Sequence, residues 1–139
     1  MGEPGFIVLH VEDDEHVSAS IRALLRPLGY EVLSAASGAE AIAQVGPGKQ
    51  QPDVLILDIV LPGEMDGVDV AQEVCRLVGH AVPTVLLSGE LTSAGVPWLP
   101  GAPLLCLWKP AQPAVLVAVI DAFARLGRVI RSLTHADRS

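Results

Sequence analysis

Four short apolar runs of this sequence each end in, or lead into, a polar or charged group. Several carboxylates brought together would repel one another, which either raises a pKa or requires a cation. Oxygen ligands suit a hard ion such as Mg²⁺, which keeps several waters and takes only one or two protein carboxylates. The runs at 6–11, 54–57, 83–88 and 104–108 carry, in this order, Glu12-Asp13-Asp14, Asp58, Ser88-Gly89 and Lys109-Pro110.

Segments of helical period separate these apolar runs. The residues Val17, Ile21, Leu24 and Leu28, for example, recur on one helical face. Further elements are predicted as a strand at Glu31–Ala35 and as helices from Ser37 (with Glu40 as a capping box) to Pro47, from Asp66 or Gly67 to Val78, and through Leu116–Ile130.

Uniformly apolar strands that alternate with helices predict an α/β fold with a doubly wound, five-stranded parallel sheet, since parallel neighbours need crossover connections. Sites in such sheets form beyond the carboxyl ends of the strands. We therefore expect Asp58 to belong to a site at that edge, although burying its charge is expensive.

Composition excludes several classes of protein. The chain of 139 residues is the length of one domain, and its formal charge of −7 argues against direct nucleic-acid binding. No apolar run reaches the roughly 18 residues of a membrane span. The N-terminus lacks a signal peptide, and Cys75 and Cys106 have no CxxC spacing, so we expect reduced core thiols in a cytoplasmic protein without membrane contact.

The order of four motifs extends over nearly the whole chain. The segments VEDD (11–14), LDIVLPGEMDG (57–67), VLLSG (85–89) and KP (109–110) resemble the receiver domain of two-component response regulators, from about Phe6 to Leu126. The resemblance implies the flavodoxin-like strand order 2-1-3-4-5. We expect an N-terminal tail at 1–5, the receiver domain at 6–127, and an extension of the last helix with a C-terminal tail at 128–139.

The resemblance also implies a site and a function. The domain would take a phosphoryl group from a histidine kinase or phosphotransfer protein onto Asp58, in a Mg²⁺-dependent reaction, and signal to a downstream protein by conformational change. It would catalyse its own phosphorylation and dephosphorylation without being a turnover enzyme. By its motifs, the resemblance implies that Asp58 is the phosphoacceptor and that Ser88 and Lys109 hold the phosphoryl oxygens. It implies a metal site made of Glu12, Asp13, Asp58 and the carbonyl of Val60.

Each of these residues also has a purely structural interpretation. Asp58 alone could be a turn or N-cap residue, and an acidic run can favour a helix N-terminus. We expect the latter role for Asp14 and Glu15, and capping or solvated positions for Asp66 and Asp69.

Three other functions compete with that of a receiver. A hydrolase of the aspartyl-phosphate type needs a second acid two residues after the nucleophile, where this chain has Val60. A nucleotide-binding module needs a Gly-rich phosphate loop after the first strand, where this chain is acidic. A degenerate receiver that only docks proteins stays open, as does the choice between a stand-alone receiver and a piece of a larger protein.

Three features of the sequence bear on how such a receiver would be switched and reset. Cys106 takes the place of an aromatic residue three positions before the lysine. Val60 and Glu90 border the path that the resemblance implies for the attacking water. Because the Val60 side chain offers no hydrogen bond to orient this water, aspartyl-phosphate hydrolysis should be slow, with Glu90 the only polar residue of the pair. Because residues 90–103 hold three prolines and two glycines, we expect a shortened or irregular fourth helix there and no phosphorylation-dependent dimer through the face that it would form with the fifth strand and last helix.

Overall fold

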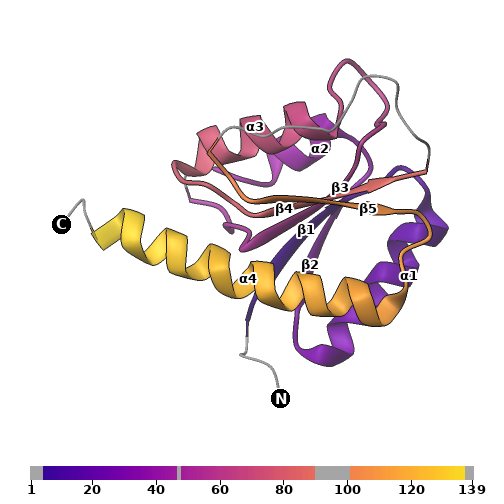
Figure 1. The fold of residues 1–139 in the computed structure, drawn as a ribbon. Coiled ribbons are helices and arrows are strands. Elements are labelled where there is room, and N and C mark those ends of the chain that lie inside the picture. Colours follow the sequence, from indigo (N-terminus) through magenta and orange to yellow (C-terminus); the bar gives the residue numbers. More distant parts are fainter. Residues whose placement is uncertain (1–4, 47, 90–100, 137–139) are drawn as a thin grey trace.

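A computed structural model of the chain describes residues 5–46, 48–89 and 101–136, except for the side chains of 135 and 136. Five strands form one parallel sheet in the order β2-β1-β3-β4-β5 (Figure 1). The predicted fold and strand order are therefore confirmed. The strands are β1 (Ile7–Val11), β2 (Glu31–Ala35), β3 (Val54–Asp58), β4 (Thr84–Ser88) and β5 (Leu104–Trp108).

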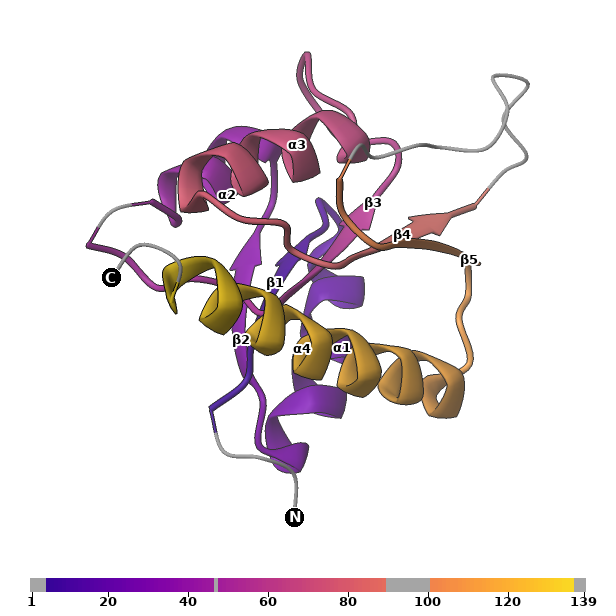
Figure 2. The ribbon, with the colours of Figure 1, turned by 60° about the vertical axis from the view of Figure 1, so that its left-hand side comes forward.

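Helices cover both faces of this sheet. α2 and α3 lie on one face, and α1 and α4 lie on the other (Figures 1 and 2). None of the helices in the described part of the chain is long and apolar enough to cross a membrane. The helices are α1 (Glu15–Leu25), followed by the 3₁₀ turn η1 (Arg26–Leu28), α2 (Gly38–Ala43), α3 (Gly67–Val78) and α4 (Pro113–Ala136).

The two faces of each strand build two separate apolar cores. Leu55 and Leu57 pack with Leu86 beneath α2 and α3, whereas Val54 and Ile56 pack on the α1 and α4 side. Strands buried on both faces read as continuous apolar runs, which is why the sequence pattern located them. The carboxyl end of β3 is held between these two layers.

Local sequence chemistry explains where the helices begin and end. Asp66 and Asp69 form a reciprocal capping box at the start of α3, which confirms their predicted role. Ser37 caps α2, but the Glu40 carboxylate accepts from the Ala36 N–H rather than from the N–H of Ser37. α1 ends at Leu25, because Pro27 lacks a backbone donor and the chain tightens into η1.

Cys106 is exposed and not a core thiol, because β5 is an edge strand whose side chains are only partly covered, whereas Cys75 is half-buried and both thiols are free. Residues 90–100 lie outside the described part of the chain, so the irregular fourth helix expected at 90–103 stays a prediction there; residues 101–103 are not helical.

A buried ionic network anchors α4 to the amino ends of the strands. The Asp53 carboxylate accepts the Ile7 N–H at 2.8 Å and lies 3.1 Å from Arg128 and 3.4 Å from Arg131. The Arg128 guanidinium also stacks 4.2 Å from the centre of the Phe6 ring. Asp53 is 1% exposed, so these partners offset the cost of burying its charge.

Gly127 lets α4 approach this network closely, because a Cβ atom there would overlap the backbone carbonyl oxygen of Asp53. We predict that Gly127→Ala lowers the free energy of unfolding by about 1–3 kcal/mol through this steric conflict, although Gly→Ala inside a helix ordinarily adds about 1 kcal/mol. Urea unfolding measures the change. Ser132→Ala, at an exposed position of α4, is the control and should not destabilise; equal behaviour of the two variants would contradict the role of Gly127.

Candidate functional site

The strand order brings the acidic groups together at the carboxyl edge of the sheet. β1 and β3 are neighbours, so Glu12, directly after β1, faces Asp58, the last residue of β3. Carboxylate oxygens of Glu12, Asp13 and Asp58 all lie within 4.8 Å of one another. Glu12 and Asp58 are buried and Asp13 is exposed, so the cluster opens to solvent on one side.

Lys109 completes this cluster from the far strand. Its ammonium lies 2.7 Å from Oδ1 of Asp58 and 3.3 Å from Oε2 of Glu12. The backbone N–H of Lys109 donates to the carbonyl of Ser88 at 2.7 Å, which continues the pairing of β5 with β4 beyond the strand end. The Lys109–Pro110 bond is cis.

A cavity of about 320 Å³ opens beside this ion pair. Ser88 lines it and is buried, while Val60 lines it with 80% of its surface exposed. Of the seven residues predicted for the site or its surroundings, Glu90 alone lies outside the described part of the chain. The remaining six, Glu12, Asp13, Asp58, Val60, Ser88 and Lys109, belong to the acidic cluster, its ion pair or this cavity.

Burial and crowding change the protonation of the cluster. Burial, followed by the hydrogen bond and repulsion from Glu12, raises the pKa of Asp58 to about 7 against the opposing pull of Lys109. Burial also acts to raise the pKa of Glu12, but hydrogen bonds and the charge of Lys109 outweigh it and lower that pKa. The metal-free pair therefore tends to share one proton, held on Asp58.

For Lys109, the attraction of its partners outweighs the effect of burial on its pKa. Burial acts to lower the pKa of Lys109, but its hydrogen bond to Asp58 and the two negative charges raise it above the ordinary value. Lys109 is therefore a fixed positive charge that faces the place where negative charge accumulates.

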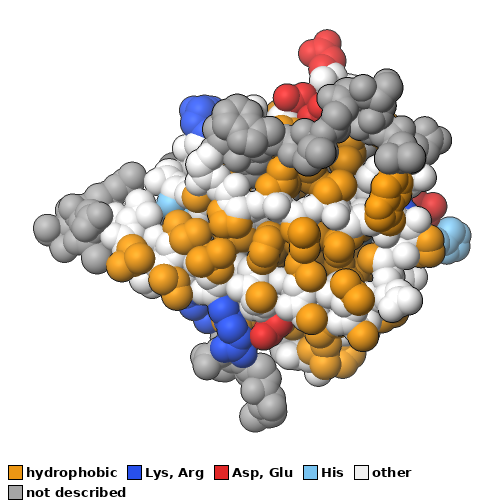
Figure 3. Space-filling model, viewed as in Figure 1, with side chains coloured by type: hydrophobic (Ala, Val, Ile, Leu, Met, Phe, Trp, Pro, Cys, Tyr) orange, Lys and Arg blue, Asp and Glu red, His pale blue; other side chains and the backbone are white. Residues whose placement is uncertain are grey.

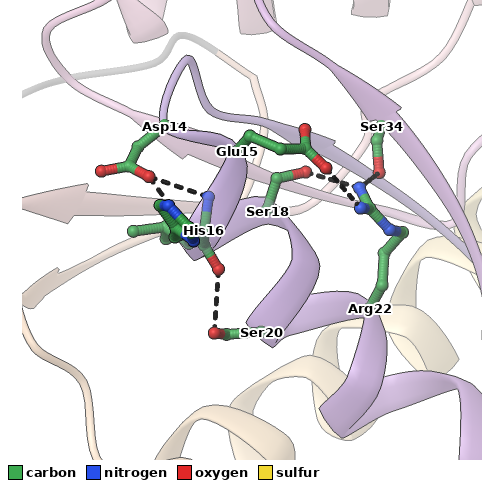
Figure 4. A network of polar contacts seen from close by, with 8 residues as sticks. Asp14, Glu15, His16, Ser18, Ser20, Arg22 and Ser34 are labelled. Atoms are coloured by element: carbon green, nitrogen blue, oxygen red, sulfur yellow. Dashed lines mark hydrogen bonds and ion pairs between the residues drawn. The ribbon is translucent and has the colours of Figure 1, made fainter.

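The second half of the acidic run has a different role. The Asp14 carboxylate accepts the N–H groups of His16 and Val17 at 2.9 and 3.3 Å and so caps α1 (Figure 4). Glu15 pairs with Arg22 at 2.8 Å, and Arg22 also donates to the hydroxyls of Ser18 at 2.8 Å and Ser34 at 3.1 Å. The structural interpretation of Asp14 and Glu15 is confirmed.

Gly67 is a positioning residue that the sequence did not single out for this role. A Cβ atom at Gly67 would overlap the backbone carbonyl oxygen of Asp58, and the Gly67 N–H donates to the carbonyl of Ile59 at 2.9 Å. The first turn of α3 thus packs directly on the backbone that carries Asp58. The only sequence signal was a glycine immediately after the capping Asp66.

Comparison with known proteins agrees with this arrangement. A family model described as the response regulator receiver domain matches residues 8–121. The chain belongs to this family. Transcriptional regulatory protein PrrA of Mycobacterium tuberculosis is 37% identical over 119 residues, which are 85% of this chain and 49% of PrrA. The chain thus spans about half the length of the curated relatives it matches.

Solved structures of receiver domains share this fold. The receiver domain of sensor histidine kinase PA1611 from Pseudomonas aeruginosa, described with a magnesium ion coordinated in its active site cleft, is 29% identical with a TM-score of 0.73, over 86% of this chain and 98% of that one. The N-terminal domain of a response regulator/sensory box/GGDEF protein from Carboxydothermus hydrogenoformans is also 29% identical, with a TM-score of 0.74 over 88% and 97%.

The raised pKa of Asp58 predicts a stability effect in the metal-free receiver. Between the ordinary pKa of 3.8 and about 7, the folded state keeps a proton that the unfolded state releases. The contribution of Asp58 to stability therefore falls as pH rises through this window and is fully unfavourable above it. Asp58→Asn should stabilise the protein by about 1–3 kcal/mol at pH 7.5, with the gain disappearing toward pH 4.

Urea unfolding in the presence of a chelator measures this effect. Asp66→Asn keeps a capping side chain at an exposed position and is the matched control, with no pH-dependent gain expected. An Asp58→Asn protein that is less stable than the wild type at pH 7.5 would show that Lys109 outweighs burial.

Proposed function

We propose that this receiver accepts a phosphoryl group on Asp58 from a phosphohistidine of a kinase or phosphotransfer protein. The observation that carries the proposal is the placement of the Asp58 carboxylate within the acidic cluster and 2.7 Å from the Lys109 ammonium. A carboxylate can attack phosphorus only where cations offset the charge on the transferring oxygens. A domain built only for docking has no need of three carboxylates gathered around a lysine at one edge of the sheet.

The residues divide the reaction among them. An oxygen of ionised Asp58 forms the new bond to phosphorus, while the bond from phosphorus to the histidine nitrogen breaks and its electron pair stays on the imidazole. Lys109 exchanges part of its pairing with Asp58 for a phosphoryl oxygen, and the Ser88 hydroxyl, on the wall of the same cavity, donates to another. Neither residue forms a covalent bond.

The donor set fits Mg²⁺. Three carboxylates within 4.8 Å, one of them carrying a raised pKa without a metal, are a place where a divalent cation would relieve repulsion. We infer that Asp13 and Asp58 would ligate it with the carbonyl of Val60, and that Glu12 would hold metal-bound water. When bound, the ion would offset the negative charge that develops on the transferring phosphoryl group.

The donor protein needs a surface near Asp58. A largely apolar groove of about 790 Å³ runs between α1 and the segment after β5, with Lys109 at its edge. We infer that the helix bearing the phosphohistidine docks here, against Val17, Leu24 and Pro113. The receiver unit would be residues 6–127, with 128–139 as its extension, and it would act as a phosphorylated switch rather than a turnover enzyme.

Incubation with acetyl phosphate and Mg²⁺, followed by intact-mass measurement, tests the acceptor. The wild type should gain one phosphoryl group, and chelation of the metal should prevent it. Asp58→Asn should gain none, whereas Asp66→Asn, an acid of the neighbouring loop that only caps α3, should be labelled like the wild type. Equal labelling of wild type and Asp58→Asn would refute Asp58 as the acceptor, whereas labelling of neither protein would favour the docking module.

A second prediction concerns the lifetime of the phosphoryl group. Val60 is exposed at the mouth of the cavity and offers no hydrogen bond to orient an attacking water. Val60→Asn would supply one, and a hydrogen bond of about 1 kcal/mol in the transition state corresponds to roughly a five- to tenfold faster dephosphorylation. Loss of the phosphorylated mass over time gives the rate. Val60→Thr, similar in shape, tests polarity with little change in size; an unchanged rate in Val60→Asn would contradict the argument.

A further inference from the structure

The charged side chains of this receiver are sorted between the two ends of its sheet. In a parallel sheet covered by helices, strands end and helices begin at the carboxyl edge, whereas helices end and strands begin at the opposite, amino edge. Many acidic residues of the described chain end a strand, follow it, or lie in the first turn of the next helix, and so share the carboxyl edge. They are Glu12, Asp13, Asp14, Glu15, Glu40, Asp58, Glu64, Asp66 and Asp69.

The basic side chains have nearly the opposite distribution. Lys109 follows β5 at the carboxyl edge, and Arg22, in the last turn of α1, reaches back to pair with Glu15. The other basic residues of the described chain lie near the ends of helices or just before a strand, and therefore toward the amino edge. They are Arg26, Lys49, Arg76, Arg125, Arg128 and Arg131.

The acids of the carboxyl edge are also less neutralised than the cations of the amino edge. Asp14 and Glu64 are exposed, and neither makes an ion pair with any residue that the structure describes. Arg128 and Arg131, by contrast, both pair with the buried Asp53. The formal charge of −7 is therefore concentrated at the carboxyl edge.

Helix capping explains only part of this pattern. Asp14 and Asp66 cap α1 and α3, where a negative charge also favours the helix dipole. Glu64 lies in the loop between β3 and α3 and caps neither helix. In Figure 3 acidic side chains stand out at the top of the view, over this loop, and Lys or Arg side chains lie at its lower edge, beside α4. Capping concerns single residues, whereas the electrostatic field of the edge is the sum of all its charges.

The acidic edge lies where the apolar groove meets the acceptor. The groove between α1 and the segment after β5 has Lys109 at its edge, and the Lys109 ammonium lies 2.7 Å from Asp58. The Asp13 carboxylate lies within 4.8 Å of that of Asp58, and Asp14 follows it in the chain. A phosphohistidine that reaches Asp58 from the groove therefore brings its flanking residues close to carboxylates.

We propose that the carboxyl edge selects a phosphoryl donor whose phosphohistidine is flanked by Lys or Arg side chains and disfavours donors that are purely anionic. Opposite charges speed the encounter of two molecules and like charges slow it, by factors that fall as salt is added. The phosphoryl group is itself anionic, so a donor without flanking cations is repelled before it reaches Lys109. This inference rests on the proposed phosphoryl transfer to Asp58 and names the chemistry of its donor.

Donors of different charge test the proposal on the full chain. They are acetyl phosphate and two short synthetic peptides that carry one phosphohistidine, flanked by lysines in one peptide and by glutamates in the other. Intact-mass measurement gives the rate of labelling at a constant Mg²⁺ concentration. In about 20 mM salt the lysine peptide should label the protein about tenfold faster than the glutamate peptide, and this ratio should fall to about twofold in about 500 mM salt.

Two charge reversals locate the effect on the molecule. Glu64→Lys changes the carboxyl edge, whereas Glu31→Lys changes an exposed residue at the start of β2, at the amino edge, so both variants have the same net charge. At low salt Glu64→Lys should slow labelling by the lysine peptide about threefold and speed labelling by acetyl phosphate about threefold. Misfolding or lost catalysis would not change the two rates in opposite directions. Glu31→Lys should keep both rates close to those of the wild type.

Several results would overturn the charge selection while leaving Asp58 as the acceptor. These are equal labelling by the two peptides at low salt, a preference that high salt does not reduce, equal effects of Glu31→Lys and Glu64→Lys, and labelling by acetyl phosphate but by neither peptide. Labelling by none of the three donors would instead refute the proposed phosphoryl transfer, and the donor selection with it.

Discussion

The charge of Asp58, held at the end of a buried strand, is the constraint on which the functional edge of this receiver depends. A lone carboxylate at that place would be strongly destabilising. Two features offset this destabilisation: Asp58 and Glu12 share a proton, and the Lys109 ammonium lies close to both carboxylates. The protein's own groups therefore neutralise the site only in part.

Holding these charges in place requires that the surrounding backbone cannot move. The N-terminal turn of α3 meets the backbone of Asp58 at Gly67, and the C-terminal half of α4 meets the backbone of Asp53 at Gly127. These two contacts lie at the two ends of β3, so helices on both faces of the sheet hold the central strand in place. In both contacts, the absence of a side chain on glycine lets a helix pack directly on the backbone of the strand.

α4 combines two environments in one helix. Its inner residues complete the core on the α1 side, whereas the apolar side chains of Leu126, Val129 and Leu133 are 40%, 54% and 64% exposed. These exposed apolar side chains contrast with the acidic character of the molecule as a whole, whose formal charge is −7.

The sequence alone determined the fold and most of the candidate site. Continuous apolar strands that alternate with segments of helical periodicity predict a parallel sheet. The polar groups that follow those strands must then meet at one edge of the sheet. Asp58, Glu12 and Lys109 were therefore predictable as a group. So was the capping box of Asp66 and Asp69, because capping depends only on residues three positions apart.

Only the tertiary structure decided the properties that arise from distant segments meeting. Cys106 looks like a core residue within its apolar run, but β5 is an edge strand and leaves it exposed. The Asp53 network, the close approaches at Gly67 and Gly127, and the raised pKa of Asp58 depend on distances between elements far apart in the chain. The sequence of α4 has apolar residues on more than one side, and periodicity cannot say which of them the sheet will cover. That choice is made by packing, because burial is a property of neighbours and not of the residue itself.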